Sequence, residues 1–423
     1  MKKIFYLMLV ALTVGMFTAC DDDDENIPDF INPEPKEQWS ATMRGDNQSI
    51  RAYPDIFANY WEYTYSFEKN PNIGLRLTGS FPKARFFNFT IYDDLTQDDM
   101  SAIEDVNIKP NEGSINPYST ETEDYGKNTY TINIIPSSTS ATLKASLQNV
   151  CEFPDTLKMV SVFMRLYLAD QMSGEEHGGV DMPAIQAFDV TTGKDVAFPT
   201  HEECQIKNIP NVPSANFTDA QKSLNFMRAP INAWYPNSPA DYLFTRIKLN
   251  SDTLAIFRFV PPVAPTKVSE YATSEVRYWS ICLGATNTLS YESSYDEEMP
   301  ARDSEGFVTI IIADKNSANL SEVQKKAEAN KGTYVMTWDR KNYGDGILAL
   351  YRNMVFSENF EHSMRKVKPI AMDLAGGGNI YMSELMQMLA MPVLGNWGPQ
   401  GYKFSEEDFL SDTFDYANIR KMR

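Results

Sequence analysis

Arginines inside apolar, strand-like runs are the residues of this sequence that combine charge with expected burial. Six positions share this setting: Arg76, Arg85, Arg165, Arg258, Arg277 and Arg352. A guanidinium in such a run must point outward or meet a carboxylate, because an unpaired buried charge is very costly. Either each arginine makes a local ion pair or faces solvent, or some of them line a groove that binds an anionic or sugar ligand bidentately.

Arg277 and Trp279 form the pair that we expect to bind a ligand. Side chains alternate along a strand, so these two share one face and Tyr278 takes the other. If two related domains pack about a pseudo-twofold axis, Arg85 approaches Arg277 in the cleft between them, and Trp234 forms a wall. The alternative places Trp279 in the core of its own domain, with Arg277 neutralised by a local acid.

Motifs of known catalytic or metal chemistry do not occur in the sequence. The histidines are His177, His201 and His362, and they form neither HExxH nor HxH. GxSxG, GxGxxG and Walker patterns are also missing, and the pair of Cys204 and His201, three residues apart, has no surrounding signature. We therefore predict no catalytic residue, no metal and no cofactor.

Carboxylates are numerous enough that counting them does not exclude a glycosidase. Such an enzyme needs two acids facing one cleft, about 5 to 9 Å apart, one with a raised pKa. The segment 291–298 is the densest mixture of acids and aromatics, and with Asp303 and Glu305 it is a candidate Ca²⁺ ligand set. A second weak calcium candidate runs from Asp339 to Gly346. An ordinary loop is the favoured interpretation of both.

Two tryptophans lie among Pro, Asn and Gly residues that are typical of loops. They are Trp234, followed by Tyr-Pro-Asn, and Trp397, followed by Gly-Pro. An exposed ring in a loop can stack on the face of a sugar. The competing interpretation is that each ring anchors its own loop.

The N-terminal segment predicts export and lipidation at Cys20. Lys2 and Lys3 precede an apolar run of roughly 14 residues, which is too short for a permanent membrane span. Thr-Ala-Cys follows as in a lipobox, although Phe17 stands where Leu is usual. Cleavage before Cys20 and acylation would anchor the chain, at roughly 0.8 kcal/mol per buried CH₂. The alternative is an ordinary signal peptide with a chance cysteine.

Five acidic residues, 21–25, follow Cys20 directly. Because like charges repel, this run indicates a solvated tether. A cysteine followed by acids resembles the export signal of Bacteroidota surface lipoproteins. The resemblance implies a location on the outer face of the outer membrane, and the periplasmic face is the alternative.

The strongly acidic balance excludes some partners. The formal net charge is −19, and loss of the lysine-bearing signal peptide makes it more negative. Such a chain is a poor partner for nucleic acid or an anionic membrane. The spacing of Cys151, Cys204 and Cys282 excludes a zinc ribbon or a CxxC motif and favours buried thiols, with at most one internal disulfide.

Aromatic and β-branched runs punctuated by Gly, Pro, Asn and Asp predict a mainly β chain. The expected strands are 85–92, 130–135, 159–168, 256–260, 277–283, 307–313, 334–338 and 347–354. Helices are expected at 218–227, 321–329 and 380–389.

Several of these runs recur in the same order in the second half of the chain. The matched positions are Arg76 with Arg258, Arg85 with Arg277, Tyr130 with Val308, and Arg165 with Arg352. We therefore predict a mainly β fold of two related β-sandwich-like domains with a small helical C-terminal extension. The expected boundaries are a signal peptide 1–19, an acidic lipidated tether 20–38, a first domain 39–200, a connector 201–224, a second domain 225–365 and the extension 366–423.

The domains also resemble a group of bacterial proteins of unknown function. In that group a strand beginning Arg-Tyr-Trp-Ser precedes a Gly-led hairpin and a final strand reading Arg-Leu-Tyr. Here these pieces are 277–280 in the second half and 165–167 in the first. The resemblance implies a β-sandwich and no particular activity.

Three functions are compatible with these features. The favoured hypothesis is a non-catalytic envelope lipoprotein that is attached to the membrane by its lipid anchor and binds a ligand, either a glycan or a small molecule. The second is a surface hydrolase that acts on glycans through paired carboxylates. The third is a structural envelope component with a protein partner that the sequence does not identify.

Overall fold

The computed structural model describes residues 33–45, 52–199, 222–228, 235–285, 290–367 and 391–420. They all belong to one compact unit, Asn32–Arg423. The predicted signal peptide, Cys20, Trp234, most of the connector and the predicted helix 380–389 lie outside the described residues. We refer below to residues 33–199 as the first half and to 222–420 as the second half.

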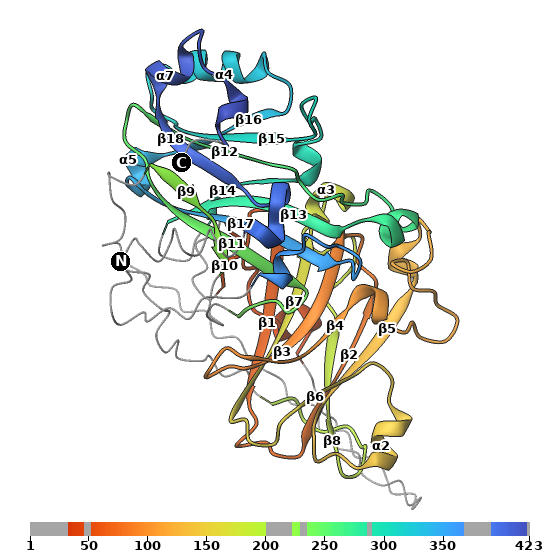
Figure 1. Ribbon diagram of the computed structural model, residues 1–423. Coiled ribbons are helices and arrows are strands. Elements are labelled where there is room, and N and C mark those ends of the chain that lie inside the picture. Colours follow the sequence, from red (N-terminus) through yellow and green to blue (C-terminus); the bar gives the residue numbers. More distant parts are fainter. Residues whose placement is uncertain are drawn as a thin grey trace, which may run out of the picture. The chain divides into compact units, whose positions relative to one another are not determined.

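The first half forms two four-stranded sheets (Figure 1). One has the order β1-β7-β3-β4, with bounds β1 Ala58–Ser66, β7 Met159–Tyr167, β3 Phe86–Asp93 and β4 Asp99–Glu104. The other has the order β6-β5-β2-β8, with bounds β6 Val150–Phe153, β5 Thr129–Pro136, β2 Ile73–Ser80 and β8 Ala184–Asp189.

The second half forms two five-stranded sheets. One has the order β10-β11-β17-β13-β14, with bounds β10 Met227–Arg228, β11 Ala240–Lys248, β17 Gly346–Phe356, β13 Val276–Gly284 and β14 Ser290–Tyr295. The other has the order β16-β15-β12-β18-β9, with bounds β16 Thr333–Trp338, β15 Val308–Asp314, β12 Thr253–Phe259, β18 Gln400–Ser405 and β9 Ser223–Asn225.

The helices are short, and most of them connect these strands. The α-helices are α1 Pro35–Gln38, α2 Ala141–Ser146, α3 Ala169–Ser173, α4 Leu320–Glu328, α5 Arg340–Tyr343 and α7 Glu406–Leu410. The 3-10 turns are η1 Asp105–Asn107, η2 Tyr125–Lys127, η4 Val268–Thr273, η5 Asp296–Glu298, η6 Met364–Lys366, η7 Gly395–Trp397 and η8 Tyr416–Asn418. The prediction of a mainly β fold is confirmed.

The two halves share one strand plan. The order β11-β17-β13-β14 repeats β1-β7-β3-β4, and β16-β15-β12-β18 repeats β6-β5-β2-β8. In each half the only parallel pair among the described strands is the matching one, β5 with β6 and β15 with β16, and a helix connects its two strands. The halves are therefore related β-sandwiches.

Strand register identifies the equivalent residues. Arg165 lies opposite Tyr60 in the first half, as Arg352 lies opposite Tyr242 in the second. One sequence match is wrong by two residues. Leu77 pairs with Ile132, and Phe259 pairs with Val308, so Val308 corresponds to Ile132 and not to Tyr130. Alternating Ile and Thr residues look alike after a shift of two, and only the pairing partner shows the register.

The C-terminal segment carries short helices, as expected, and also a sheet strand. Strand β18 pairs with β12 along Thr253–Arg258, the position that β8 occupies beside β2. The second sandwich therefore uses residues beyond 365 to complete its sheet. Helices α4 and α7 cover the outer face of this sheet (Figure 1), where Val323 and Phe409 are fully buried. The predicted helix 321–329 is α4, whereas the described part of 218–227 forms strand and not helix.

Three apolar cores lie between successive sheets. One fills the sandwich of the first half and one fills that of the second. The third joins the halves and contains residues of both, such as Tyr60, Phe163, Tyr167, Tyr278 and Met354. Because side chains alternate along a strand, the sheets β1-β7-β3-β4 and β10-β11-β17-β13-β14 supply one face to their own core and the other to this contact.

Candidate ligand-binding surface

Arginines at equivalent positions exchange partners between the halves. Arg85 lies just before β3, and its guanidinium contacts Asp296 at 2.9 Å. Arg277 at the start of β13 contacts Asp105 at 2.9 Å. Each acid begins the 3-10 turn that follows the edge strand of the opposite half. The two ion pairs therefore join the halves reciprocally, and Arg85 makes a further pair with Glu297.

Both acids are buried, and burial dominates their titration. Burial raises the pKa of Asp105 to about 6, against the opposing effects of the Arg277 charge and two backbone N–H donors. Burial likewise raises the pKa of Asp296, and Arg85 opposes that rise. Burial raises the pKa of a carboxyl and a nearby guanidinium lowers it. At both acids the effect of burial is the larger, so the pKa rises.

The residues predicted to bind a ligand have other contacts. Trp279 is fully buried in the core of the second half, 5.8 Å from Phe259 between ring centroids. The Arg277 guanidinium lies 3.4 Å from the ring centroid of Tyr271. This arrangement is closer to the alternative in which Trp279 lies in the core of its own domain and an acid neutralises Arg277. It differs in that the acid, Asp105, belongs to the other half. Ligand binding by Arg277, Trp279 and Arg85 stays a prediction, and Trp234 lies outside the described residues.

The other strand arginines differ in what they meet. Arg76 pairs with Asp195, and Arg258 pairs with Asp303 and Glu305 within its own half. Arg352 and Arg165 lie in the contact between the halves, where Arg352 pairs with Asp55. Arg165 makes no ion pair with a described residue.

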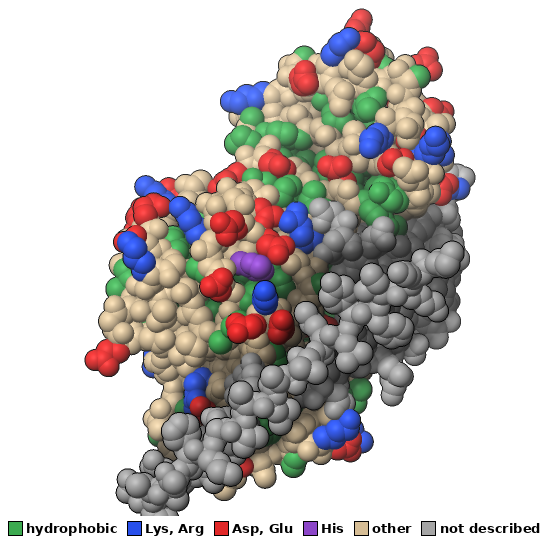
Figure 2. Space-filling model, turned by 180° about the vertical axis from the view of Figure 1, so that it is seen from behind, with side chains coloured by type: hydrophobic (Ala, Val, Ile, Leu, Met, Phe, Trp, Pro, Cys, Tyr) green, Lys and Arg blue, Asp and Glu red, His purple; other side chains and the backbone are tan. Residues whose placement is uncertain are grey.

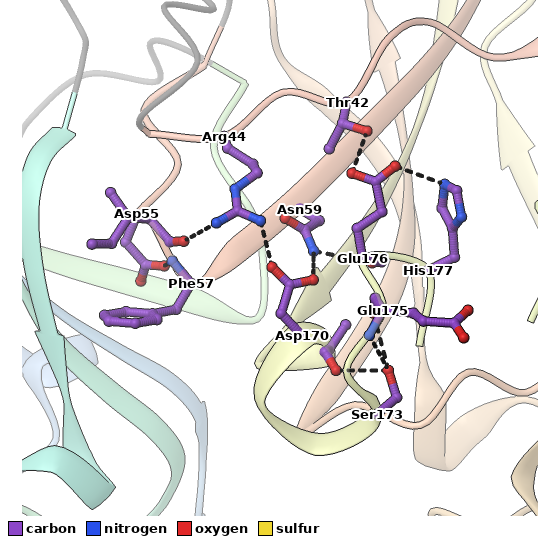
Figure 3. A network of polar contacts seen from close by, with 12 residues as sticks. Thr42, Arg44, Asp55, Phe57, Asn59, Asp170, Ser173, Glu175, Glu176 and His177 are labelled. Atoms are coloured by element: carbon purple, nitrogen blue, oxygen red, sulfur yellow. Dashed lines mark hydrogen bonds and ion pairs between the residues drawn. The ribbon is translucent and has the colours of Figure 1, made fainter. Parts of the chain in front are cut away.

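A polar network surrounds Glu176 and His177 (Figure 3). The Glu176 carboxylate accepts a hydrogen bond from Thr42 at 3.0 Å and lies 3.4 Å from Nε2 of His177. Asn59 donates to the backbone oxygen of Glu176 and to Asp170. Carboxylate and imidazole together are the groups of a general base, and both are solvent-accessible here.

The order of contacts in this network is not that of a hydrolase triad. A triad needs the hydroxyl bonded to the imidazole and the imidazole bonded to the acid. Here the Thr42 hydroxyl donates to the carboxylate and accepts from the Trp61 indole N–H at 3.0 Å. The ring of His177 packs against Trp61, at 5.0 Å between centroids. The network therefore fastens the turn around His177 to the first sandwich.

An aromatic ring at the surface of the second half has a more suitable geometry for a ligand. Tyr343, the last residue of α5, is 41% exposed, and it is the one aromatic among the four exposed large hydrophobic side chains of the described residues. Its ring stacks on Tyr291 of β14, with centroids 3.7 Å apart and planes 12° from parallel. Trp338 supports both rings from the buried side. The Tyr343 ring is therefore exposed and held in place.

Hydrogen bonds fix the backbone that carries Tyr343. Asp339 caps α5 by accepting from the backbone N–H of Asn342 at 3.2 Å. The indole N–H of the buried Trp338 donates to the carbonyl of Gly344 at 2.8 Å. Gly344 has a φ of 82°, a conformation that suits glycine and ends the turn. The ring thus projects from a turn that is pinned on both sides.

Polar side chains gather around the partly buried Asp339, at the start of the turn that carries this ring. Asn342 donates to Asp339 at 2.8 Å, and Asn316 donates to the same carboxylate at 3.4 Å. The ammonium of Lys315 lies 3.9 Å from Asp339. We call Tyr343, Asn342, Asp339, Asn316 and Lys315 the Tyr343 surface. It combines a flat apolar face with amide, carboxylate and ammonium groups.

Two segments that the sequence analysis singled out for other chemistry contribute to this surface. Tyr291 opens the acid–aromatic segment, and Tyr343 lies inside the weak calcium candidate that begins at Asp339. No group of three or more metal-ligating side chains occurs within the part of the chain that the structure describes. The signal that could have found the surface is an aromatic flanked by Asn and Gly in a capped turn.

Trp397, the other predicted sugar-stacking ring, packs against its own surroundings. It stacks on His362 at 4.1 Å between centroids, with the planes 11° apart. Its indole N–H donates to Glu275 at 3.3 Å, and Phe360 lies against it. The ring is partly buried, as expected for a tryptophan that anchors its loop.

The remaining surface features carry little specific chemistry. Figure 2 shows one face on which acidic and basic side chains are interspersed and hydrophobic ones form small groups. No described helix is long and apolar enough to cross a membrane. Cys151 and Cys282 are free and buried, and burial raises the pKa of their thiols to about 12 and about 11.

Comparisons with known proteins find only weak structural likeness. No protein-family model matches the chain, and no curated protein matches it. An uncharacterised protein from Burkholderia cenocepacia has 9% identity and a TM-score of 0.44, over 72% of this chain and 75% of that one. A protein from Vibrio parahaemolyticus has 9% identity and a TM-score of 0.40, over 73% and 87%.

Proposed function

We propose that this protein is a lipid-anchored lipoprotein of the outer membrane that faces outward and binds a glycan without transforming it. The observation that carries the glycan assignment is the exposed ring of Tyr343 stacked on Tyr291. The lipobox ending at Cys20 and the acidic run that follows support the location.

The chemistry of the Tyr343 surface suits a sugar ring. The C–H face of a pyranose is apolar and lies flat on an aromatic ring, while its hydroxyls need donors and acceptors at the edge. Asp339 and Asn342 supply both kinds of group in the turn that carries Tyr343. Because the turn is already fixed, binding orders few side chains and loses little conformational entropy.

Binding to immobilised polysaccharides tests this proposal. The protein without its signal peptide and lipid, in the wild type and two variants, is run in native gels containing defined glycans. Tyr343→Ala should weaken retardation roughly 5- to 30-fold, the equivalent of about 1–2 kcal/mol of stacking. Tyr343→Phe keeps the ring and should bind like the wild type. Equal retardation of all three proteins, or none by any glycan, contradicts the proposal.

A glycan hydrolase is the second candidate, and one observation favours it. Burial raises the pKa of Glu292, and the charge of Glu298 adds to the rise. A carboxyl with a raised pKa beside a second acid is what a glycosidase needs. Sugar release from a glycan by the wild type, abolished in Glu292→Gln, would replace the binding proposal.

The anchor and the third candidate have their own measurements. Cys20→Ala should leave the chain as a precursor or release it from membranes, and protease shaving of whole cells should digest the wild type. Normal processing and membrane fractionation of Cys20→Ala would remove the lipobox interpretation. Stable co-purification of one envelope protein with the lipidated chain, independent of Tyr343, would favour a structural component.

A further inference from the structure

Two short segments of related sequence, 53–55 and 235–237, cross between the halves. They read Tyr-Pro-Asp and Tyr-Pro-Asn. The tyrosine carbonyl of the first accepts a hydrogen bond from Arg352 at 2.8 Å, and that of the second accepts one from Arg165 at 2.9 Å. Each segment therefore meets the arginine of the opposite half, at one register position of two equivalent sheets.

The third residue of each segment breaks the symmetry. Asp55 is fully buried, and its carboxylate contacts Arg352 at 2.5 Å. The hydroxyls of Tyr278 and Ser280 donate to the same carboxylate at 2.8 and 3.0 Å. At the equivalent position Asn237 supplies a neutral amide. Among the described residues, one arginine of the pair thus has a counter-charge in contact and the other does not.

Arg165 is left with unsatisfied donors. It is 1% exposed, and its Nε and Nη1 have no hydrogen-bond partner among the described residues. The Nδ2 of Asn237, itself 2% exposed, has none either. The guanidinium carbon lies 4.8, 5.3 and 4.9 Å from the ring centroids of Tyr60, Tyr92 and Phe163. Each aromatic face recovers about 2 kcal/mol or more for a desolvated cation, but a ring supplies no acceptor for the unpaired N–H groups.

The other acids nearby do not neutralise this charge by contact. Asp94 is buried and accepts from the hydroxyl of Tyr235 at 2.7 Å, whereas Arg165 bonds to the carbonyl at the other end of that tyrosine. Asp55 is in contact with Arg352. A buried guanidinium without an anion is strongly unfavourable. A negatively charged group that accepts from several N–H donors would resolve the imbalance.

We propose that Arg165 and Asn237 bind a halide ion, chloride under physiological conditions, in the contact between the two halves. The Nε–H and Nη1–H bonds of a guanidinium point in different directions, so the ion accepts from one of these two donors, Nη1, and from Nδ2 of Asn237. It takes the role that the Asp55 carboxylate has beside Arg352. A monoatomic anion matches a site whose two binding side chains are almost entirely buried, and it would stabilise the packing of one sandwich on the other.

Thermal unfolding with chloride exchanged for gluconate at constant ionic strength tests the site. The melting temperature should rise about 1–3 °C for each tenfold increase in chloride above the dissociation constant. Crystals grown in bromide should give an anomalous peak in contact with Arg165. Equal melting temperatures in the two salts, or a water at that place in bromide crystals, would overturn the proposal.

Asn237→Asp gives a sharper test, because it supplies the carboxylate that Asp55 supplies in the other half. This variant should lose its response to chloride, and its melting temperature in gluconate should rise towards that of the wild type in chloride. Asn359→Asp adds the same charge in the exposed turn after β17 and should keep the full response. An unchanged response in Asn237→Asp contradicts the site. If that variant does not fold, Arg165→Met and the bromide crystals decide.

Discussion

Arg277 of the second half reaches Asp105 of the first half at 2.9 Å, with the acid fully buried and the arginine nearly so. Its equivalent, Arg85, makes the reverse contact with Asp296. Two sandwiches that already have cores of their own are thus joined by charges that neither could bury alone. The stability of this contact should therefore depend on pH and on keeping both partners.

Asp105→Asn tests the pH dependence. Burial raises the folded-state pKa of Asp105 from 3.8 to about 6, so the folded protein holds this proton more tightly than the unfolded chain. The contribution to stability is full below about pH 3.8 and is lost as the pH rises through 6, by about 3 kcal/mol at most. In denaturant unfolding between pH 4 and 7.5, the free energy of unfolding of the variant should increase relative to that of the wild type as the pH rises.

Asp189→Asn is the matched control for that experiment. Hydrogen bonds from Thr192 and Thr191 lower the pKa of Asp189. Its contribution is therefore present at neutral pH and is lost as the pH falls through the lowered value. Between pH 4 and 7.5 the difference in unfolding free energy between this variant and the wild type should therefore change little, and the wild type should lose its advantage only below about pH 4. Parallel curves for Asp105→Asn and the wild type would show that Asp105 does not titrate in this range.

A double-mutant cycle on Arg277 and Asp105 measures their coupling. Arg277→Met alone leaves the buried Asp105 carboxyl without its cation and should cost roughly 3–5 kcal/mol at neutral pH. Asp105→Asn replaces a carboxyl whose ionised form burial disfavours, so it should cost less. The double variant should be less destabilised than the sum of the two. The same cycle on the more exposed pair Lys144 and Glu152 should give less than about 1 kcal/mol. Additive effects at the buried pair would indicate that the contact carries no coupling.

Gly401 should tolerate no side chain. A Cβ there would lie 2.0 Å from the carbonyl oxygen of Ile256 and 2.5 Å from the Cα of Phe257, both backbone atoms of β12. Gly401→Ala should therefore separate β18 from β12 and cost more than about 2 kcal/mol in denaturant unfolding. Gly126→Ala meets only a methyl of Val180 at 3.2 Å and a more distant backbone oxygen, so it should change stability little.

The thiols of Cys151 and Cys282 should be unreactive in the folded protein. Burial raises their pKa to about 12 and about 11, which leaves almost no thiolate at neutral pH. In a chain carrying Cys20→Ala and Cys204→Ser, a thiol reagent at pH 8 should label neither residue until denaturant is added. Rapid labelling of the native protein would show that one of these sites opens readily.

Much of the local structure follows from the sequence. Period-two runs of Val, Ile and aromatic residues predicted the strands, and Ser321 to Ala329 predicted α4 to within one residue at each end. The ordered recurrence of Arg76, Arg165 and their counterparts predicted a duplicated sandwich. These patterns extend over a few residues, so each strand or helix can be predicted from its own segment of the chain.

Pairing partners and contacts between the halves required the tertiary structure. The sequence placed Arg85 and Arg277 together at a cleft, but it could not show that each meets an acid of the other half. The sequence around Gln400 does not indicate that β18 pairs with β12, because the two strands are distant in sequence. Tyr343 stacks on Tyr291 from 52 residues away.

The physical reason is the range of each interaction. Alternation, capping and turn preferences act over a few residues and can be recognised within a segment. Ion pairing, ring stacking and desolvation depend on which atoms meet in space, and that is set by the packing of whole sheets. The sequence by itself therefore determined the elements and their repetition, while the folded chain decided that Arg277 is neutralised, Trp279 is buried and Tyr343 is exposed.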